Sequence, residues 1–524
     1  MNFFKDKNFW LSFLQPYLIS IYPAVMVAGG NLGQFYFSEF LIYICFLFVL
    51  ILSVFSFLTF LYKDWNKSSL FLSLFLIFFY GFHHFANIYL IPVAIFTEKY
   101  FFKFQVRYSF IIAVSLLIYL FLKLFKIKKV HKVFARVLIF PLLIIYVWAF
   151  IQMGIFYKEL NIEIKKWDSL QDQVYEKYFT NLNLDKNNKK LPDIYYIILD
   201  TYTSEKALKK YHDKDISWFT DNLKKKGFYI AQDSFCNYVC TEISLASSLN
   251  MIHHDNFPRE MFYGFLHHQI KNNLIIKFLK NLNYKHVYIG YDIPLVIKDL
   301  NKRSLVNDIK DYFTASFYDM IRPFSFIPCV LGGWSLWYYH WTKLEAYRHR
   351  NTILNNLINL ENVINIDGPK FVFTHIECPH APYVFDENGD YVDVDPDMAY
   401  AAQTEFISRK IDKVLDLILD RNKNSVIILQ GDHGLPITGT FAGGEIERFT
   451  DFDYEVKLVF PILNAYYFPF SDDKKNLYNN ISPVNSFRIL FNNYFGTRFE
   501  LLREDSFIGP DNTGQLYKMN NFLT

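Results

Sequence analysis

Residues 194–200 read IYYIILD, an uninterrupted apolar run that ends in an aspartate. Three further short runs have the same character: HVYIG at 286–290, FVFTHI at 371–376 and VIILQGD at 426–432. Apolar runs of this length without alternation are typical of strands that are buried on both faces. Stretches with helical composition lie between them, at residues 216–226, 267–281, 348–361 and 400–420. This alternation predicts an α/β domain with a mostly parallel sheet.

Two of these runs end in acidic residues where sites form in such sheets. Asp200 ends the first run, and Asp432 ends the last and is followed by His433 and a glycine. The carboxyl ends of parallel strands meet at one edge of a sheet, so we expect these side chains to form a metal site. An aspartate at a strand end also commonly caps a helix or forms a turn, and for each acid taken alone that alternative stays open.

Thr241 is a candidate nucleophile, because its hydroxyl precedes a helix-like stretch in NYVCTEISLASSLN, residues 237–250. A helix N-terminus favours an alkoxide and binds the oxygens of a phosphate or sulfate. Thr241 could equally be a helix N-cap with no chemical role.

Two histidines follow the run at 371–376, within THIECPHAPY. His375 and His380 are five residues apart in a turn-rich segment, and either could bind substrate or metal. A histidine beside proline in a loop is otherwise often a packing or surface residue.

The N-terminal part of the chain is strongly apolar, in a sequence of 524 residues that is 52% hydrophobic and 20% aromatic. Five segments lack charged residues, at 8–38, 40–62, 68–97, 108–122 and 137–157. A transmembrane helix needs about 20 apolar residues, so the fourth segment spans only if its flanking basic side chains reach the interfaces. We therefore expect a five-helix transmembrane bundle over residues 1–157.

The charges between these segments predict the orientation. The loop at 123–136 contains six basic residues and, by the positive-inside rule, lies in the cytoplasm together with the N-terminus; Lys99, Lys103 and Arg107 are weak evidence against this. An odd number of spans then places the rest of the chain outside the cytoplasm. We expect an amphipathic connector and linker at 158–190 and the catalytic domain at 191–524.

Composition also limits the partners. The net charge is only +3, and no basic stripe with interleaved aromatic residues lies outside the loop between spans, so nucleic acid is not an expected partner. Cys236 and Cys240 are four residues apart and form either a local disulfide or two buried thiols. His253 and His254 are expected at the surface.

The motifs occur in a specific order. PDIYYIILD is followed by NYVCTEISLASSLNM, FVFTHIECPHAPYVFD, VIILQGDHG, FPILNAYYFP and ISPVNSFRILFNNYFG. This series resembles the membrane-bound, sulfatase-like branch of the alkaline phosphatase superfamily over residues 191–505. Five spans before such a domain also resemble lipoteichoic acid synthases and lipid A phosphoethanolamine transferases.

The resemblance implies a set of roles. Asp200, Thr241, Asp432 and His433 would bind one divalent metal, zinc or manganese, with Thr241 also the catalytic nucleophile. His380 would be catalytic and, with His375, would contact the transferred group. The donor would be a membrane phospholipid and the acceptor a surface glycan or lipid, outside the cytoplasmic membrane.

Two departures from the motifs of other members of the superfamily narrow the expected class of enzyme. Neither Cys236 nor Cys240 is followed by the Pro and Arg of the C/S-x-P-x-R motif, which argues against a formylglycine sulfatase. No histidine follows His433, which argues against a two-metal phosphatase. The remaining prediction is a transferase of phosphoethanolamine or phosphoglycerol that forms a covalent threonine intermediate. A sulfatase-like or phosphoester hydrolase and a non-catalytic envelope scaffold are the alternatives, and the oligomeric state stays open.

Overall fold

The computed structural model describes residues 5–30, 37–85, 133, 137–180, 182, 191–254, 262–290, 334–391, 396–435, 452–469, 474, 476–509 and 515–519. These residues belong to two compact units. One unit contains the described residues up to Glu159 together with residues 334–341, and the other contains the remaining described residues from Leu160 onward, including the sheet.

The N-terminal unit is helical. It contains α1 (Lys7–Gly30), α2 (Phe37–Tyr62), α3 (Trp65–Phe85) and the first part of α7 (Ile139–Phe179). Three helices among the described residues, α1, α2 and α7, are long and apolar enough to cross a membrane. The predicted third span is helical as far as Phe85, while its remainder and the predicted span at 108–122 lie outside the described residues. The five-helix bundle therefore stays a prediction.

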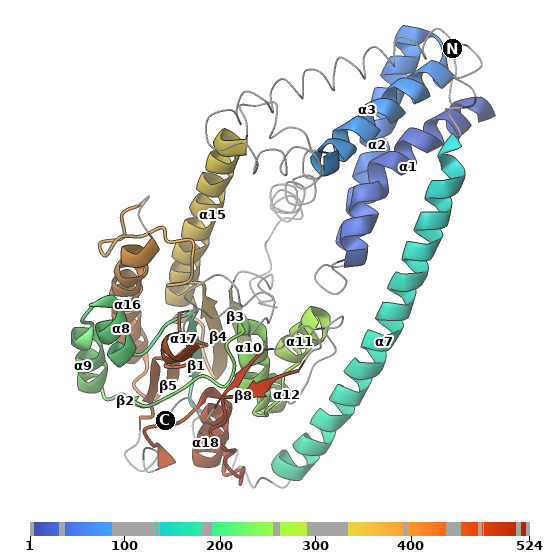
Figure 1. Ribbon diagram of the computed structural model, residues 1–524. Coiled ribbons are helices and arrows are strands. Elements are labelled where there is room, and N and C mark those ends of the chain that lie inside the picture. Colours follow the sequence, from blue (N-terminus) through green and yellow to red (C-terminus); the bar gives the residue numbers. More distant parts are fainter. Residues whose placement is uncertain are drawn as a thin grey trace. The chain divides into compact units, whose positions relative to one another are not determined.

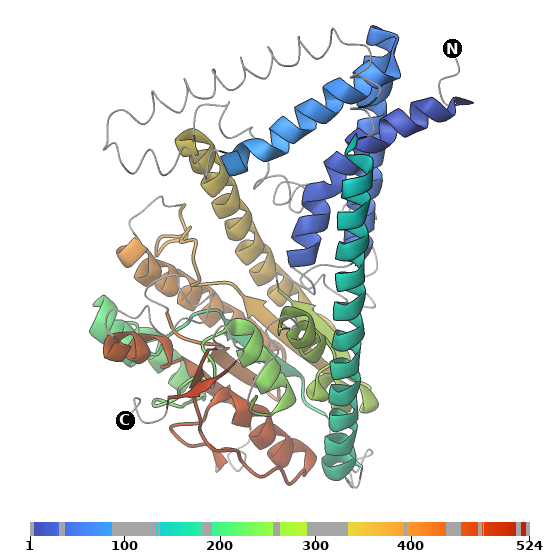
Figure 2. The same ribbon diagram turned by 45° about the vertical axis from the view of Figure 1, so that its right-hand side comes forward.

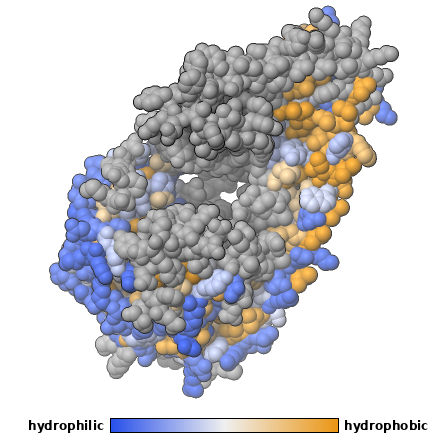
Figure 3. Space-filling model, viewed as in Figure 1, coloured by the Kyte–Doolittle hydropathy of each residue, from blue (hydrophilic) through white to orange (hydrophobic). Residues whose placement is uncertain are grey.

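Apolar side chains lie on both the inner and the outer faces of these helices. Inside the unit, Val25 of α1 and Tyr43 of α2 pack in one cluster with Met153 of α7. On the outside, Phe60 is 68% exposed and Phe140 is 72% exposed. Figure 3 shows the hydrophobic surface that results. Large exposed apolar surfaces are costly in water, so this pattern is typical of helices that face lipid.

The second unit is built on a six-stranded sheet with the order β2-β6-β5-β1-β4-β3. The strands are β1 (Ile194–Leu199), β2 (Tyr229–Ile230), β3 (Lys285–Ile289), β4 (Lys370–Ile376), β5 (Val426–Gly431) and β6 (Asn464–Tyr467). The four strands β3, β4, β1 and β5 are parallel, while β6 and β2 extend the sheet in antiparallel pairings. The prediction of a mostly parallel sheet is confirmed.

Helices cover both faces of this sheet (Figures 1 and 2). Tyr196 and Ile198 of β1 pack into one core cluster, and Tyr195 and Ile197 pack into another on the opposite face. The first cluster includes residues of α10 (Thr241–Asn250), α11 (Phe262–Lys271), α12 (Leu274–Asn281) and α18 (Pro483–Phe495). The second includes residues of α8 (Glu205–His212), α9 (Ser217–Lys225), α15 (Trp334–Val363) and α16 (Pro396–Arg421). Burial on both faces explains why β1 is apolar throughout and why β5 is apolar from Val426 to Leu429.

Three small elements complete the described unit: α17 (Phe452–Val459) and the antiparallel pair β7 (Phe507–Ile508) and β8 (Tyr517–Lys518). The single helix expected at 267–281 is wrong, because the chain forms α11 and α12 there. The side chain of Asn273 accepts a hydrogen bond from the Ile276 amide and so caps a new helix.

The expected connector begins inside a continuous helix, because α7 extends to Phe179. Its C-terminal part packs on the sheet unit: Gln171 Nε2 donates to Asn250 Oδ1 at 2.7 Å, and the Phe179 ring stacks on Phe278 at 4.1 Å. His254 is buried, contrary to the expectation, because the Trp167 ring of α7 packs 6.0 Å from its ring. The predicted domain boundaries stay predictions.

Arg488 of α18 holds the C-terminal end of α10, the helix that begins with Thr241. Its Nε and Nη2 donate to the Met251 carbonyl at 3.0 and 2.6 Å. Arg488→Met should lower the stability by about 2 to 4 kcal/mol, because charge-assisted hydrogen bonds are lost and a carbonyl is left without a partner. The measurement is the thermal unfolding midpoint of the full chain in detergent.

Arg498→Met is the matched control, because Arg498 is exposed and should shift the midpoint little. Equal midpoints for the two variants would show that Arg488 does not stabilise the end of α10.

Candidate active site

The sheet register brings the first acidic residue to the centre of one edge. Leu199 pairs with Gly431 of β5 on one side and with Ile376 of β4 on the other, so Asp200 and Asp432 follow paired positions. The Asp200 amide donates to the Ile376 carbonyl at 2.9 Å, which continues the strand pairing. Asp200 is 5% exposed.

Asp432 and His433 lie in a turn of closely packed backbone after β5. A Cβ on Gly431 would lie 2.3 Å from the Tyr202 carbonyl oxygen, and a Cβ on Gly434 would lie 2.3 Å from that of Leu458. Only glycine fits at these two positions. The residues of the GDHG motif therefore include two that permit the turn and two that point functional groups into the site.

The ring of His433 is oriented by the backbone. Its Nδ1 donates to the Gly434 carbonyl at 2.8 Å, since a carbonyl can only accept. Its Nε2 faces the site and lies 3.5 Å from Asp432 Oδ2 and 3.9 Å from Asp200 Oδ1. A backbone partner on one nitrogen, with the other nitrogen directed at the acids, is the arrangement that metal-binding histidines adopt.

Thr201 links the two carboxylates. Its amide donates to Asp432 Oδ1 at 3.0 Å, directly after Asp200 in the chain. Its φ is +60°, a left-handed conformation that is costly for a β-branched residue. We infer that the turn after β1 is held in this conformation by its surroundings.

Thr241 is the first residue of α10, and Cys240 occupies the N-cap position without a side-chain cap bond. The alternative that Thr241 is the N-cap is therefore wrong. Thr241 Oγ1 instead lies 3.2 Å from His433 Nε2. One turn later, Ser244 Oγ donates to the Asp432 carbonyl at 2.8 Å and ties α10 to the turn after β5.

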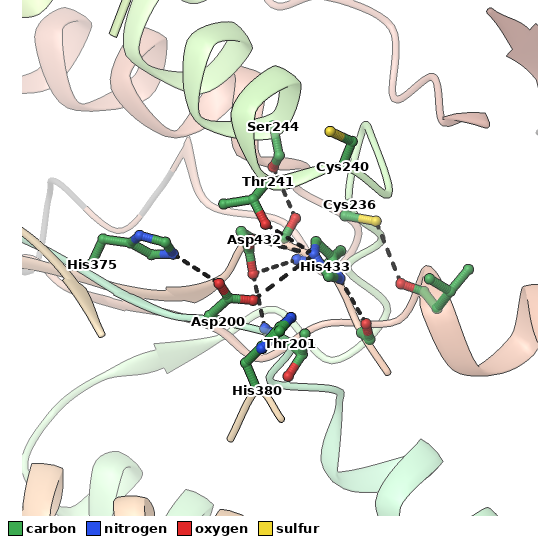
Figure 4. Close-up of polar contacts among 12 residues, drawn as sticks. Asp200, Thr201, Cys236, Cys240, Thr241, Ser244, His375, His380, Asp432 and His433 are labelled. Atoms are coloured by element: carbon green, nitrogen blue, oxygen red, sulfur yellow. Dashed lines mark hydrogen bonds and ion pairs between the residues drawn. The ribbon is translucent and has the colours of Figure 1, made fainter. Parts of the chain in front are cut away.

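The structure places the two remaining histidines differently. His375 Nε2 lies 3.2 Å from Asp200 Oδ2, and the residue is buried (Figure 4). His380 is exposed, and its ring Nδ1 donates a hydrogen bond to the neighbouring Ala381 carbonyl. We call Asp200, His375, Asp432 and His433 the acid–histidine cluster.

Burial and charge act against each other on the two acids. Burial would raise the pKa of Asp200, but the neighbouring His375, His380 and His433 outweigh it and hold the pKa below its ordinary value. Burial, together with the charge of Asp200, raises the pKa of Asp432.

The two histidines of the cluster show the complementary effect. Burial would lower the pKa of His375, but its contact with Asp200 and the surrounding carboxylates raise it to about 9. The pKa of His433 is also raised, because the charges of Asp432 and Asp200 outweigh its burial. The acids and histidines therefore stabilise one another's charged forms.

The cluster fits a divalent cation. One ligand atom each from Asp200, His375 and Asp432 lie within 4.8 Å of one another. Asp200 Oδ1, Asp432 Oδ2 and His375 Nε2 are buried without a hydrogen-bond partner, although His375 lies close to Asp200. Buried polar atoms without partners are costly, and a cation would remove that cost. Oxygen and imidazole donors suit zinc or manganese.

The predicted site residues come together, with two differences in position. His375, expected to contact substrate, lies among the candidate ligands. His380 is close enough to lower the pKa of Asp200, but its ring nitrogen Nδ1 bonds to the Ala381 carbonyl. Thr201 and Ser244 were not predicted as site residues, because the role of Thr201 depends on a backbone torsion and that of Ser244 on helix packing. Cys236 and Cys240 are free thiols in this structure and form no disulfide.

Comparisons with known proteins gave structural neighbours only. No family model and no curated protein sequence matches the chain. The C-terminal periplasmic domain of EptC from Escherichia coli is 11% identical, with a TM-score of 0.37 over 64% of this chain and 95% of that chain. The C-terminal periplasmic domain of the phosphoethanolamine transferase EptC from Campylobacter jejuni is 10% identical, with a TM-score of 0.33 over 60% and 94%.

A third neighbour is a 2-O GAG sulfatase, 11% identical, with a TM-score of 0.35 over 59% of this chain and 72% of that chain. Both kinds of neighbour, the phosphoethanolamine transferase domains and the sulfatase, belong to the superfamily that the sequence motifs resemble. Similarity at this level does not transfer an activity or a substrate to this chain. A function for this chain therefore has to be argued from the geometry of the acid–histidine cluster.

Removing one carboxylate tests the metal site without an activity assay. Zinc or manganese should raise the thermal midpoint of the full chain by the equivalent of about 2.7 kcal/mol at a hundredfold excess over the dissociation constant. Asp432→Asn should abolish this shift, because it removes one of the two carboxylates that would hold the cation.

Asp416→Asn is the control, since the Asp416 side chain is 55% exposed and pairs with Lys226 on the surface. It should keep the full metal-dependent shift. An unchanged shift in Asp432→Asn would contradict a metal site at this cluster.

Proposed function

We propose that the protein is a membrane-anchored, metal-dependent transferase that moves a phospho-group from a phospholipid through a covalent intermediate on Thr241. The observation that carries the proposal is the position of the Thr241 hydroxyl. It lies 3.2 Å from His433 Nε2, at the first residue of a helix, beside two buried carboxylates whose inner oxygens lack partners. A hydroxyl in these surroundings is suited to nucleophilic attack.

Asp200, Asp432, His433 and the Thr241 hydroxyl are the proposed ligands. A divalent cation bound there supplies positive charge that favours the deprotonated Thr241 and the anionic oxygens of the group. The start of α10, where no side chain forms a cap bond, adds backbone N–H groups and the positive end of the helix dipole.

The first half of the reaction places the group on the protein. Deprotonated Thr241 Oγ1 attacks phosphorus, its new bond to phosphorus forms, and the bond from phosphorus to the lipid oxygen breaks. Protonated His380 gives its proton to that oxygen, which leaves as an alcohol. His375 is buried beside Asp200, with its Nε2 3.2 Å from Asp200 Oδ2, and contacts the oxygens of the transferred group.

The second half returns Thr241 to its starting state. Neutral His380 takes the proton of an acceptor hydroxyl, and the acceptor oxygen attacks phosphorus while the bond to Thr241 Oγ1 breaks. His380 is exposed, which leaves its ring accessible to an acceptor. The acceptor is a hydroxyl of an envelope glycan or lipid, and water in its place would make the protein a hydrolase.

Membrane attachment supports a lipid donor. The three apolar helices α1, α2 and α7 are candidate membrane spans. Together with the five spans and the basic loops predicted from the sequence, they favour a catalytic domain outside the cytoplasmic membrane. In this proposal residues 1–157 form the membrane bundle, 158–190 connect it, and 191–524 form the catalytic domain. The donor head group is phosphoethanolamine or phosphoglycerol.

Mass spectrometry of the full chain tests the proposal. The protein in nanodiscs with phosphatidylethanolamine and phosphatidylglycerol, supplied with zinc or manganese, should gain a mass that maps to Thr241. Thr241→Ala should lose the adduct and lower turnover by at least roughly 10³-fold, because it removes the nucleophile. The mass of the adduct identifies the transferred group.

Thr241→Ser is the matched control, since it keeps a hydroxyl at the start of α10 and should keep the adduct. An adduct that only water discharges would support the hydrolase. An adduct that persists in Thr241→Ala, or its absence from the wild type, would contradict a Thr241 intermediate.

A further inference from the structure

One buried side chain holds the loop that carries His380. Gln403 of α16 is fully buried, and its Nε2 donates to the Pro379 and His380 carbonyls at 3.2 and 2.9 Å. Its Oε1 accepts from the Val384 and Phe385 amides at 2.8 and 3.2 Å. A side-chain amide has two donor hydrogens and two acceptor lone pairs, so every hydrogen-bonding position of Gln403 is used on this one loop.

Other contacts fix the same loop on α16. The Phe385 ring stacks on Phe406, one turn beyond Gln403, with centroids 4.0 Å apart. On the other side, His349 Nε2 of α15 lies 3.4 Å from the His380 carbonyl oxygen. The backbone of the loop is therefore held at both ends, although the His380 side chain is exposed.

The same face of α16 also contacts the turn after Asp200. Tyr400 lies one turn before Gln403, and its hydroxyl donates to the Thr201 carbonyl at 2.7 Å and accepts from the Thr203 amide at 3.2 Å. Residues three apart on a helix lie side by side. α16 thus fixes the turn that carries Asp200 and the loop that carries His380 relative to each other.

We propose that Gln403 is a positioning residue that sets the place of His380 relative to the transferred group. The inference rests on the proposed function, in which His380 exchanges a proton with the leaving and accepting oxygens. Loss of the clamp leaves the chemistry of Thr241 intact but displaces the proton donor. A displacement of about 1 Å can cost roughly 10²-fold in rate.

Gln403→Leu tests the clamp in the full chain in nanodiscs. Amide hydrogen exchange at Val384 and Phe385 should rise by at least about tenfold, because both amides lose their acceptor. The value of kcat should fall by about 10- to 100-fold, with a smaller change in KM, because positioning acts on the transition state. Exchange that stays at the wild-type rate would overturn the clamp.

A double-mutant cycle separates positioning from a merely structural role. In the His380→Ala background, Gln403→Leu should lower kcat by less than about 3-fold, since its effect passes through a side chain that is already absent. An equal loss in both backgrounds would overturn the proposal. Exchange that rises without any loss of kcat in the wild-type background would also overturn it.

Two further variants guard against a general loss of folding. Gln403→Glu keeps the acceptor for the two amides and removes the donors to the Pro379 and His380 carbonyls, so it should lower kcat with little change in exchange.

Gln269→Leu is the matched control on α11, because Gln269 is fully buried and its amide atoms have no hydrogen-bond partner among the described residues. It should leave both kcat and exchange unchanged.

The exchange measurement also separates this inference from the proposed function. A wild type that forms no Thr241 adduct would contradict the function. The exchange rates at Val384 and Phe385 would still decide whether Gln403 holds the loop.

Discussion

Two buried carboxylates at the ends of neighbouring parallel strands are the constraint on which the site depends. The register of β1 and β5 sets Asp200 and Asp432 side by side, and burial makes their mutual repulsion costly. The structure opposes that repulsion with His375 and His433, and with the Thr201 amide on Asp432. Oxygens that still lack partners leave a place for a cation.

The surrounding elements serve to hold this arrangement in place. α10 brings the Thr241 hydroxyl to His433, and Ser244 ties that helix to the Asp432 backbone. α16 fixes the turn after Asp200 through Tyr400 and the loop that carries His380 through Gln403. The site residues come from several segments of the chain. The site is nevertheless rigid, because these residues lie at strand ends and at a helix start and are held by a buried helix face.

The sequence predicted much of the fold and the site, because uninterrupted apolar runs reveal buried strands and their last residues lie at one edge. The position of His375 among the candidate ligands depends on the register of β4 against β1, which no local pattern encodes. Gln403 lies inside a helix and has no signature that marks it as a loop clamp. The break between α11 and α12, by contrast, could have been predicted, because asparagine often caps helices and Asn273 is the N-cap of α12.

X-ray absorption spectroscopy of the zinc-loaded full chain, with the metal content measured on the same sample, tests the central claim most directly. We expect one zinc ion per chain with oxygen ligands and an imidazole contribution, and loss of that ion in Asp200→Asn. A sulfur ligand shell would instead point to cysteines such as Cys236 and Cys240. That result, or a chain that binds no ion, would contradict a metal centre built on Asp200 and Asp432.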